Sequence, residues 1–292
     1  MNNLPMPALP GNLPWETNSY LLLDGVSVGR LPQKLYQWSA SPVFEPLYLG
    51  ADWQELADLS PCLILLNGKH DPIMQAFIDN AAWEWGYLIF TRSGFDETLR
   101  HLRWLLRVEP QETESVLLRL ADPAVAHQLL AIGNPRLFGP IEQVCAPDAI
   151  EGVWHRHQRT GSIPDPDQTH LYCLSDQELT ALGEVSFRQM IMVLDEHMRA
   201  FFPTYQPALR GRERLWHLRA LAERAYQSGM CSQREILLFA NVFGFLGDQS
   251  LENHPDIACL LDKFSAQPPG QRVELAACLA EQRATELDGM PS

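Results

Sequence analysis

The chain has 292 residues, of which 46% are hydrophobic and 20% are charged, a composition typical of a soluble globular protein. Its 36 Asp and Glu outnumber its 22 Lys and Arg, which gives a formal net charge of −14 at pH 7. This acidic balance argues against nucleic acid or an anionic membrane surface as the main partner, and favours a basic protein partner or simple solubility.

The sequence also predicts the cellular location of the protein. Its first residues carry neither a basic region nor a long apolar run, so we expect no secretory signal. The longest uncharged apolar stretch, 236–247, is too short to span a bilayer, so no membrane insertion is expected. The six cysteines include no Cys-x-x-Cys pair, which favours reduced core residues in a cytoplasmic protein.

Strands and helices alternate in the first half of the chain. After a proline-rich, irregular arm at residues 1–16, we expect an α/β lobe with a mixed sheet over 17–146. The expected strands are 20–23, 46–49, 62–66, 85–91 and a buried one at 116–120, and the expected helices are 31–38, 53–59, 72–83, one opened by Ser93 and Asp96 as a capping box, and 124–132.

An arginine stripe marks the helix that follows Ser93. Arg100, Arg103 and Arg107 fall on one helical face and the leucines on another. A solvated or ion-paired face is one interpretation, and a grip on a carboxylate-rich partner is the other.

The next segment predicts an ion pair and a rigid turn. Arg119 ends the expected strand, and Asp122 with Pro123 supplies an N-cap and a first-turn proline for the next helix. We expect Arg119 and Asp122 to pair, because charges that leave water need partners. Phe138-Gly139-Pro140-Ile141 ends the unit.

The periodicity changes after residue 174. Residues 147–174 are expected to connect two lobes, with a strand near Val153-Trp154. Ser175 with Glu178, and Ser232 with Glu235, are capping boxes that open helices, and the apolar spacing stays helical to the end. The sequence therefore predicts two lobes, an α/β lobe and an all-helical lobe over 175–292.

Few residues suggest chemistry. Gly25-Val26-Ser27-Val28-Gly29 matches the nucleophile elbow of serine hydrolases, but a turn after the first strand explains it as well. His155, His157, Asp165, Asp167 and His170 are metal-type residues that lack metal-site spacing, so a polar connector is the favoured interpretation. We expect no metal, no cofactor and no phosphate-binding motif. Trp154 lies near a segment end, where interface anchors often occur.

An ordered series of short motifs resembles a known family. The motifs are Tyr20-Leu21-Leu22-Leu23-Asp24-Gly25, Pro46-Leu47-Tyr48-Leu49, Ser60-Pro61-Cys62-Leu63-Ile64, Trp85-Gly86, His101-Leu102-Arg103, Arg119 with Asp122-Pro123, Phe138-Gly139-Pro140-Ile141, Ala225-Tyr226 with Ser228-Gly229-Met230 and Ser232, and Phe245-Leu246-Gly247. Together they resemble the effector adaptor/chaperone family of type VI secretion (Tap/Tec proteins). One departure is Leu120-Ala121, where the family often has an aromatic residue before the Asp-Pro pair.

The resemblance implies a non-catalytic cytoplasmic protein of bacteria. Such a protein would hold a toxic effector encoded nearby, commonly through the effector's N-terminal segment, and help load it onto the VgrG spike. The implied architecture is an α/β lobe, a helical lobe and a groove that takes an effector helix. Arg119, Asp122 and the Phe138–Ile141 turn would then frame the first lobe. The alternatives are a hydrolase that uses Ser27 and a structural component of the secretion apparatus.

Overall fold

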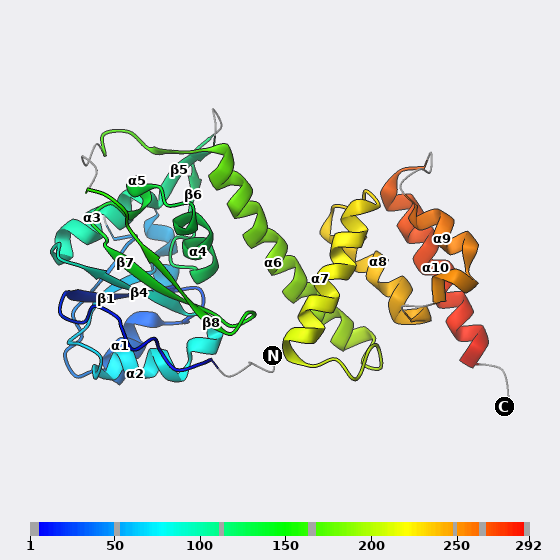
Figure 1. Cartoon of the computed structure of the whole chain (residues 1–292), viewed down its shortest axis with the longest axis horizontal. Helices are drawn as coiled ribbons and strands as arrows, with labels where there is room; N and C mark the ends of the chain where they lie inside the picture. The colour runs from blue at the N-terminus through cyan, green and yellow to red at the C-terminus, as the bar shows by residue number, and fades with distance from the viewer. Residues whose placement is uncertain are drawn as a thin grey trace. The chain divides into compact units, whose positions relative to one another are not determined.

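The computed structural model describes residues 6–49, 53–110, 114–162, 168–247, 250–262 and 267–288. The chain divides into two compact units, Met1–Val185 and Ser186–Ser292 (Figure 1). The first unit combines strands and helices, and the described part of the second is helical. The predicted fold class, α+β or α/β with strands and helices in the N-terminal part and helices in the C-terminal part, is therefore confirmed as α+β.

A six-stranded sheet forms the centre of the first unit. Its order is β2-β3-β1-β4-β7-β8, and every neighbouring pair is antiparallel. The strands are β1 (Asn18–Leu23), β2 (Phe44–Pro46), β3 (Cys62–Leu65), β4 (Gly86–Thr91), β7 (Gln143–Asp148) and β8 (Val153–Gln158). The segment 147–174, expected to connect two lobes, thus contributes β8 to this sheet.

The central strand β1 explains why both faces of the sheet are covered. Side chains alternate along a strand, yet Tyr20, Leu21, Leu22 and Leu23 are all buried. Tyr20 and Leu22 belong to one hydrophobic cluster, and Leu21 and Leu23 belong to another.

Helices supply the rest of these two clusters. Residues of α1 (Leu31–Trp38) and α2 (Pro72–Asp79) pack in the cluster of Leu21, whereas α3 (Phe95–Leu105), α4 (Pro123–Ala131) and α5 (Pro135–Phe138) pack in the cluster of Leu22. Two short 3-10 helices, η1 (Gln54–Leu59) and η2 (Ala81–Trp83), precede β3 and β4 in the chain.

Local capping was predicted well, with one exception. The side chains of Asp71 and Asp122 cap α2 and α4, each accepting a backbone N–H bond at 2.9 Å. The capping box expected at Ser93 is wrong, because Gly94 is the N-cap of α3 and the N–H of Ser93 donates to Thr91 Oγ1 at 3.0 Å.

A smaller sheet is the mixed one. It has the order β6-β5-β9, formed by β6 (Val116–Leu117), β5 (Arg107–Pro110) and β9 (Tyr172–Leu174), with β5 parallel to β9 and antiparallel to β6. Of the buried strand expected at 116–120, only Val116 and Leu117 form a strand, and the buried residues Leu118 and Leu120 follow it. Both residues of β6 are exposed, and the chain turns after them because the N–H of Asp122 bonds the carbonyl of Arg119.

Helices and their apolar faces build the second unit. α6 (Asp176–Phe201) begins in the first unit, and α7 (Gly211–Gln227), α8 (Gln233–Leu246), η3 (Ser250–Asn253), α9 (Pro255–Leu261) and α10 (Pro269–Asp288) follow. Leu194, Leu218 and Phe243 lie fully buried in their shared core. The capping boxes predicted at Ser175 and Ser232 are both confirmed by reciprocal hydrogen bonds to Glu178 and Glu235.

Candidate functional site

A polar cluster forms where β1 ends, around the buried carboxylate of Asp24. Its side chain is 4% exposed, and Oδ2 accepts a hydrogen bond from Arg119 Nη2 at 2.6 Å. Oδ2 also accepts from the Ser27 hydroxyl at 2.8 Å, and Oδ1 accepts from the N–H of Val26 at 3.2 Å. An Asp followed by such a turn satisfies its own carboxylate with local donors, and Arg119 adds the charge that a buried carboxylate needs.

Arg119 joins two segments that are far apart in the sequence. Its predicted partner Asp122 is present but secondary, with Nη1 to Oδ2 at 3.7 Å. Burial alone would lower the pKa of Arg119. The hydrogen bond and charge of Asp24, with the charge of Asp122, outweigh burial, so the pKa of Arg119 is raised overall. The guanidinium is 44% exposed, so the pair lies half in solvent. The predicted pairing of Arg119 with Asp122 is therefore present, within a three-membered cluster in which Asp24 is the nearer carboxylate.

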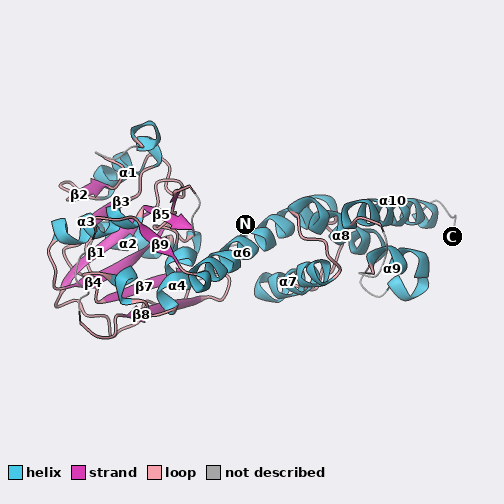
Figure 2. Ribbon diagram, turned by 90° about the horizontal axis from the view of Figure 1, so that it is seen from above, coloured by secondary structure: helices cyan, strands magenta, loops and turns pink. Residues whose placement is uncertain are grey.

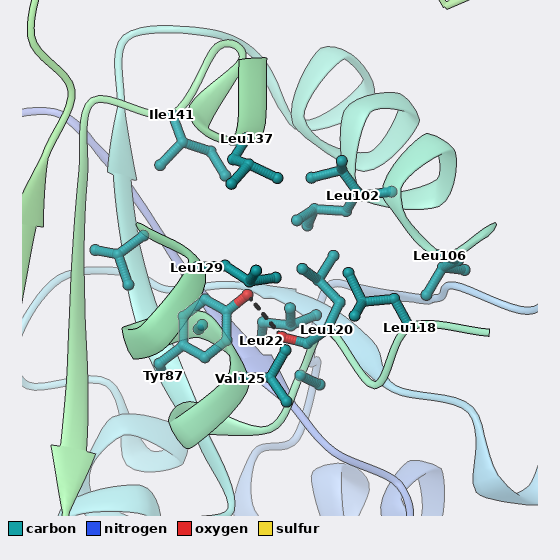
Figure 3. Packing of buried hydrophobic residues seen from close by; sticks show 14 of the residues in the cluster. Leu22, Tyr87, Leu102, Leu106, Leu118, Leu120, Val125, Leu129, Leu137 and Ile141 are labelled. Carbon is teal, nitrogen blue, oxygen red and sulfur yellow. Dashed lines mark hydrogen bonds between the residues drawn. The ribbon is translucent and has the colours of Figure 1, made fainter. Parts of the chain in front are cut away.

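The turn that carries Arg119 is also held to the sheet. Tyr87, on β4, donates its hydroxyl to the carbonyl of Leu120 at 3.1 Å. Figure 3 shows this bond among the packed side chains of Leu22, Leu102, Val125 and Leu129. Leu120 therefore points into the core while its neighbour Arg119 reaches Asp24, which gives the site a fixed backbone.

The geometry around Ser27 does not favour a nucleophile. The Ser27 hydroxyl donates its proton to Asp24, and Arg119 Nη2 lies 3.4 Å from the same oxygen. A guanidinium cannot act as a general base, and a carboxylate already neutralised by it is a weak one. Gly25 instead explains the motif, since a Cβ there would lie 2.4 Å from the carbonyl oxygen of Ser60.

The Phe138–Ile141 turn packs against α3. Gly139 adopts φ +52°, and a Cβ at this position would lie 2.3 Å from the imidazole ring of His101. His101 is buried and donates Nε2–H to the carbonyl of Leu137 at 3.0 Å, because a carbonyl can only accept. Burial lowers the pKa of His101 to about 4. Thr91 Oγ1, on β4, donates to the carbonyl of Pro140 at 2.7 Å, so the turn is bonded to the central sheet.

The arginine stripe is not a single helical face. α3 ends at Leu105, so Arg107 lies on β5, where its Nε donates to Ser115 Oγ at 2.8 Å. Arg103 donates to the carbonyls of Pro46 and Leu47 and pairs with Glu45. Arg100 is exposed on α3. Helical spacing alone could not reveal that the helix ends before the third arginine.

Trp154 and the histidines lie on opposite faces of β8. The indole N–H of Trp154 donates to the carbonyl of Pro7 at 2.9 Å, so this residue holds the N-terminal arm. On the other face, the rings of His127 and His155 stack at 3.6 Å, and His127 Nδ1 lies 2.9 Å from His157 Nε2. His127, on α4, was missed from the sequence, because 28 residues separate it from His155.

The described ranges of the chain hold no group of three or more His, Cys, Asp or Glu placed to bind a metal ion. Asp165 and Asp167 lie outside these ranges. None of the helices described is both long enough and apolar enough to cross a membrane.

Comparison with known proteins identifies the family. Residues 19–137 match the model of a family described as a domain of unknown function, DUF4123, and this match includes Asp24, Ser27, Arg119 and Asp122. The chain belongs to this family, and the resemblance to the adaptor/chaperone family of type VI secretion is confirmed. Because it belongs to this family, the chain is associated with type VI secretion.

A relative matches nearly the whole chain. The chain is 32% identical over 267 residues to the accessory protein VasW of Vibrio cholerae serotype O1, and the match covers 91% of this chain and 88% of VasW. Both units of the structure therefore take part in the similarity. No solved structure matches.

Proposed function

We propose that this protein is a non-catalytic adaptor/chaperone that works in the cytoplasm, binds a type VI secretion effector through the effector's N-terminal segment, and helps load it onto the VgrG spike. The observation that carries this proposal is the similarity to an accessory protein along nine-tenths of the chain. The polar groups of the first unit support it. Asp24, Arg119 and Asp122 satisfy one another within the fold, and Thr91 bonds the Phe138–Ile141 turn, as the parts of a binding scaffold do.

Co-expression tests this proposal. The chain would be produced with the tagged product of the adjacent open reading frame, and the pair purified by tag capture and size exclusion. The expected result is a stable complex that keeps the neighbour soluble. A neighbour that is soluble alone and elutes separately, together with no capture by VgrG, would contradict the proposal.

The hydrolase alternative has a separate test. A fluorophosphonate probe labels an activated serine and loses that label in Ser27→Ala. Because Ser27 is held by Asp24 and Arg119, we expect the wild-type chain and the variant to remain equally unlabelled. Assembly of the chain with itself or with the spike when no effector is present would instead favour a structural component.

A further inference from the structure

The main sheet has an open edge at β8. Figure 2 shows β8 as the outermost strand of this sheet. The N–H of Arg159 donates to the carbonyl of Glu142, so in this register Val153, His155 and His157 also direct their backbone groups toward β7. The backbone groups of Trp154, Arg156 and Gln158 consequently point away from the sheet.

These outward backbone groups have no partner in the described ranges. The side chains of Trp154 and Arg156 bond Pro7 and Asn12 of the N-terminal arm across one face of the strand, and neither bond uses the outward backbone groups. A strand of six residues spans about 20 Å, which is long enough for another strand to pair with it.

The opposite edge of the same sheet is closed. β2 has three residues, and Pro46 removes one of its backbone donors. Arg103 of α3 occupies the carbonyls of Pro46 and Leu47, at 2.9 Å and 3.1 Å. In the smaller sheet, the edge strands β6 and β9 have two and three residues. β8 is therefore the edge with room for a partner strand.

The chemistry of β8 indicates which strand fits. The first unit has 11 Lys and Arg against 23 Asp and Glu, yet residues 153–159 contain two Arg, two His and no carboxylate. Within the described ranges, Arg156 donates to the amide oxygen of Asn12, and Arg159 donates to the carbonyls of Ile141 and Gly161. Both guanidinium groups therefore keep their positive charge available to a partner in an otherwise acidic unit.

We propose that β8 is the docking edge for an extended, acidic segment of the effector, which adds a seventh strand to the sheet. This inference rests on the proposed function and names the surface that carries it. Backbone hydrogen bonds to Trp154, Arg156 and Gln158 supply affinity, and carboxylates of the incoming strand face Arg156.

Gln158 allows a clean test of the backbone pairing. Its side chain is exposed and its N–H points outward, so Gln158→Pro removes an edge donor without breaking the β7–β8 ladder. Gln158→Ala is the matched control, because it keeps the N–H. We expect Gln158→Pro to capture at least tenfold less of the adjacent reading frame's product than Gln158→Ala does, at an equal melting temperature.

The acidic character of the incoming strand has its own pair of variants. Arg156→Gln keeps the backbone N–H and removes the charge, so we expect a several-fold weaker complex. Lys69→Gln, which removes an exposed charge from the loop before α2, should leave the complex unchanged. Equal weakening by both variants, or by neither, would overturn the acidic partner strand.

Hydrogen exchange on the wild-type chain tests the pairing without any substitution. The amides of Arg156 and Gln158 should exchange rapidly in the free protein and become protected in the complex. A wild-type complex with no added protection at 153–159, or equal capture by the proline and alanine variants, would overturn this inference alone. A wild-type chain that captures no effector would overturn the proposed function and this inference together.

Discussion

Removing the Asp24 carboxylate should destabilise the first unit. Asp24→Ala leaves Arg119 with the 3.7 Å contact to Asp122 and the 3.4 Å contact to the Ser27 oxygen, and it removes the acceptor of the Ser27 hydroxyl. Breaking a fully buried pair costs about 3–5 kcal/mol, and water at the half-exposed Arg119 recovers part of this loss. We therefore expect a loss of about 3 kcal/mol, which corresponds to a melting temperature lower by roughly 6–12 °C.

Tryptophan fluorescence is a suitable assay, because seven of the eight tryptophans lie in the first unit. Asp122→Ala, which removes a helix cap, should cost about 1 kcal/mol and weaken effector binding only as stability falls. Asp58→Ala on the exposed surface should stay within about 0.5 kcal/mol of the wild type. If Asp24→Ala unfolded at the same temperature as Asp58→Ala, the Asp24–Arg119 pair would not stabilise the first unit. If Asp122→Ala kept full stability and lost only effector binding, Asp122 would be a binding residue and not part of the frame.

Three further predictions concern other packed groups. Gly139→Ala should lower the free energy of unfolding in urea by about 3 kcal/mol, because the backbone is strained and the new Cβ clashes with His101. Gly133 also has a positive φ but has open space around it, so Gly133→Ala should cost only about 1 kcal/mol. Equal losses would contradict the clash. Burial lowers the pKa of folded His101 to about 4, so the stability from its neutral form is present above pH 6.5 and is lost as the pH falls toward 4. In urea titrations at pH 7 and pH 4, His101→Gln should therefore lose about 3 kcal/mol less stability than the wild type between the two pH values. An equal loss in both proteins would be inconsistent with a buried imidazole. Buried Arg272 donates hydrogen bonds to the carbonyls of Ser228, Leu260, Asp262 and Gln267. Arg272→Lys should therefore lower the melting temperature of the helical unit, measured by circular dichroism, far more than Arg234→Lys, which changes an exposed ion pair. Equal shifts would argue that Arg272 does not hold these segments together.

Sequence reasoning succeeded where structure depends on neighbouring residues. The caps at Asp71, Asp122, Ser175 and Ser232 were found because a side chain that bonds a backbone N–H two or three residues away leaves a short-range pattern. The change from alternating elements to helices was visible for the same reason, since hydrophobic periodicity is a local property.

Long-range contacts could not be predicted in this way. Asp24 and Arg119 are 95 residues apart, and neither residue type indicates its partner. The strand order β2-β3-β1-β4-β7-β8 depends on which edges meet in space, so an alternating pattern could not exclude a mixed central sheet. Arg107 was assigned to a helix because its spacing from Arg103 is helical, whereas pairing with β6 and β9 draws it into a strand.

A three-component capture shows whether the chain brings an effector to the spike. Tagged VgrG would be mixed with the product of the adjacent open reading frame in the presence and absence of the chain. We expect VgrG to retain the effector only when the chain is present. Retention of the effector without the chain, or no retention in its presence, would contradict it.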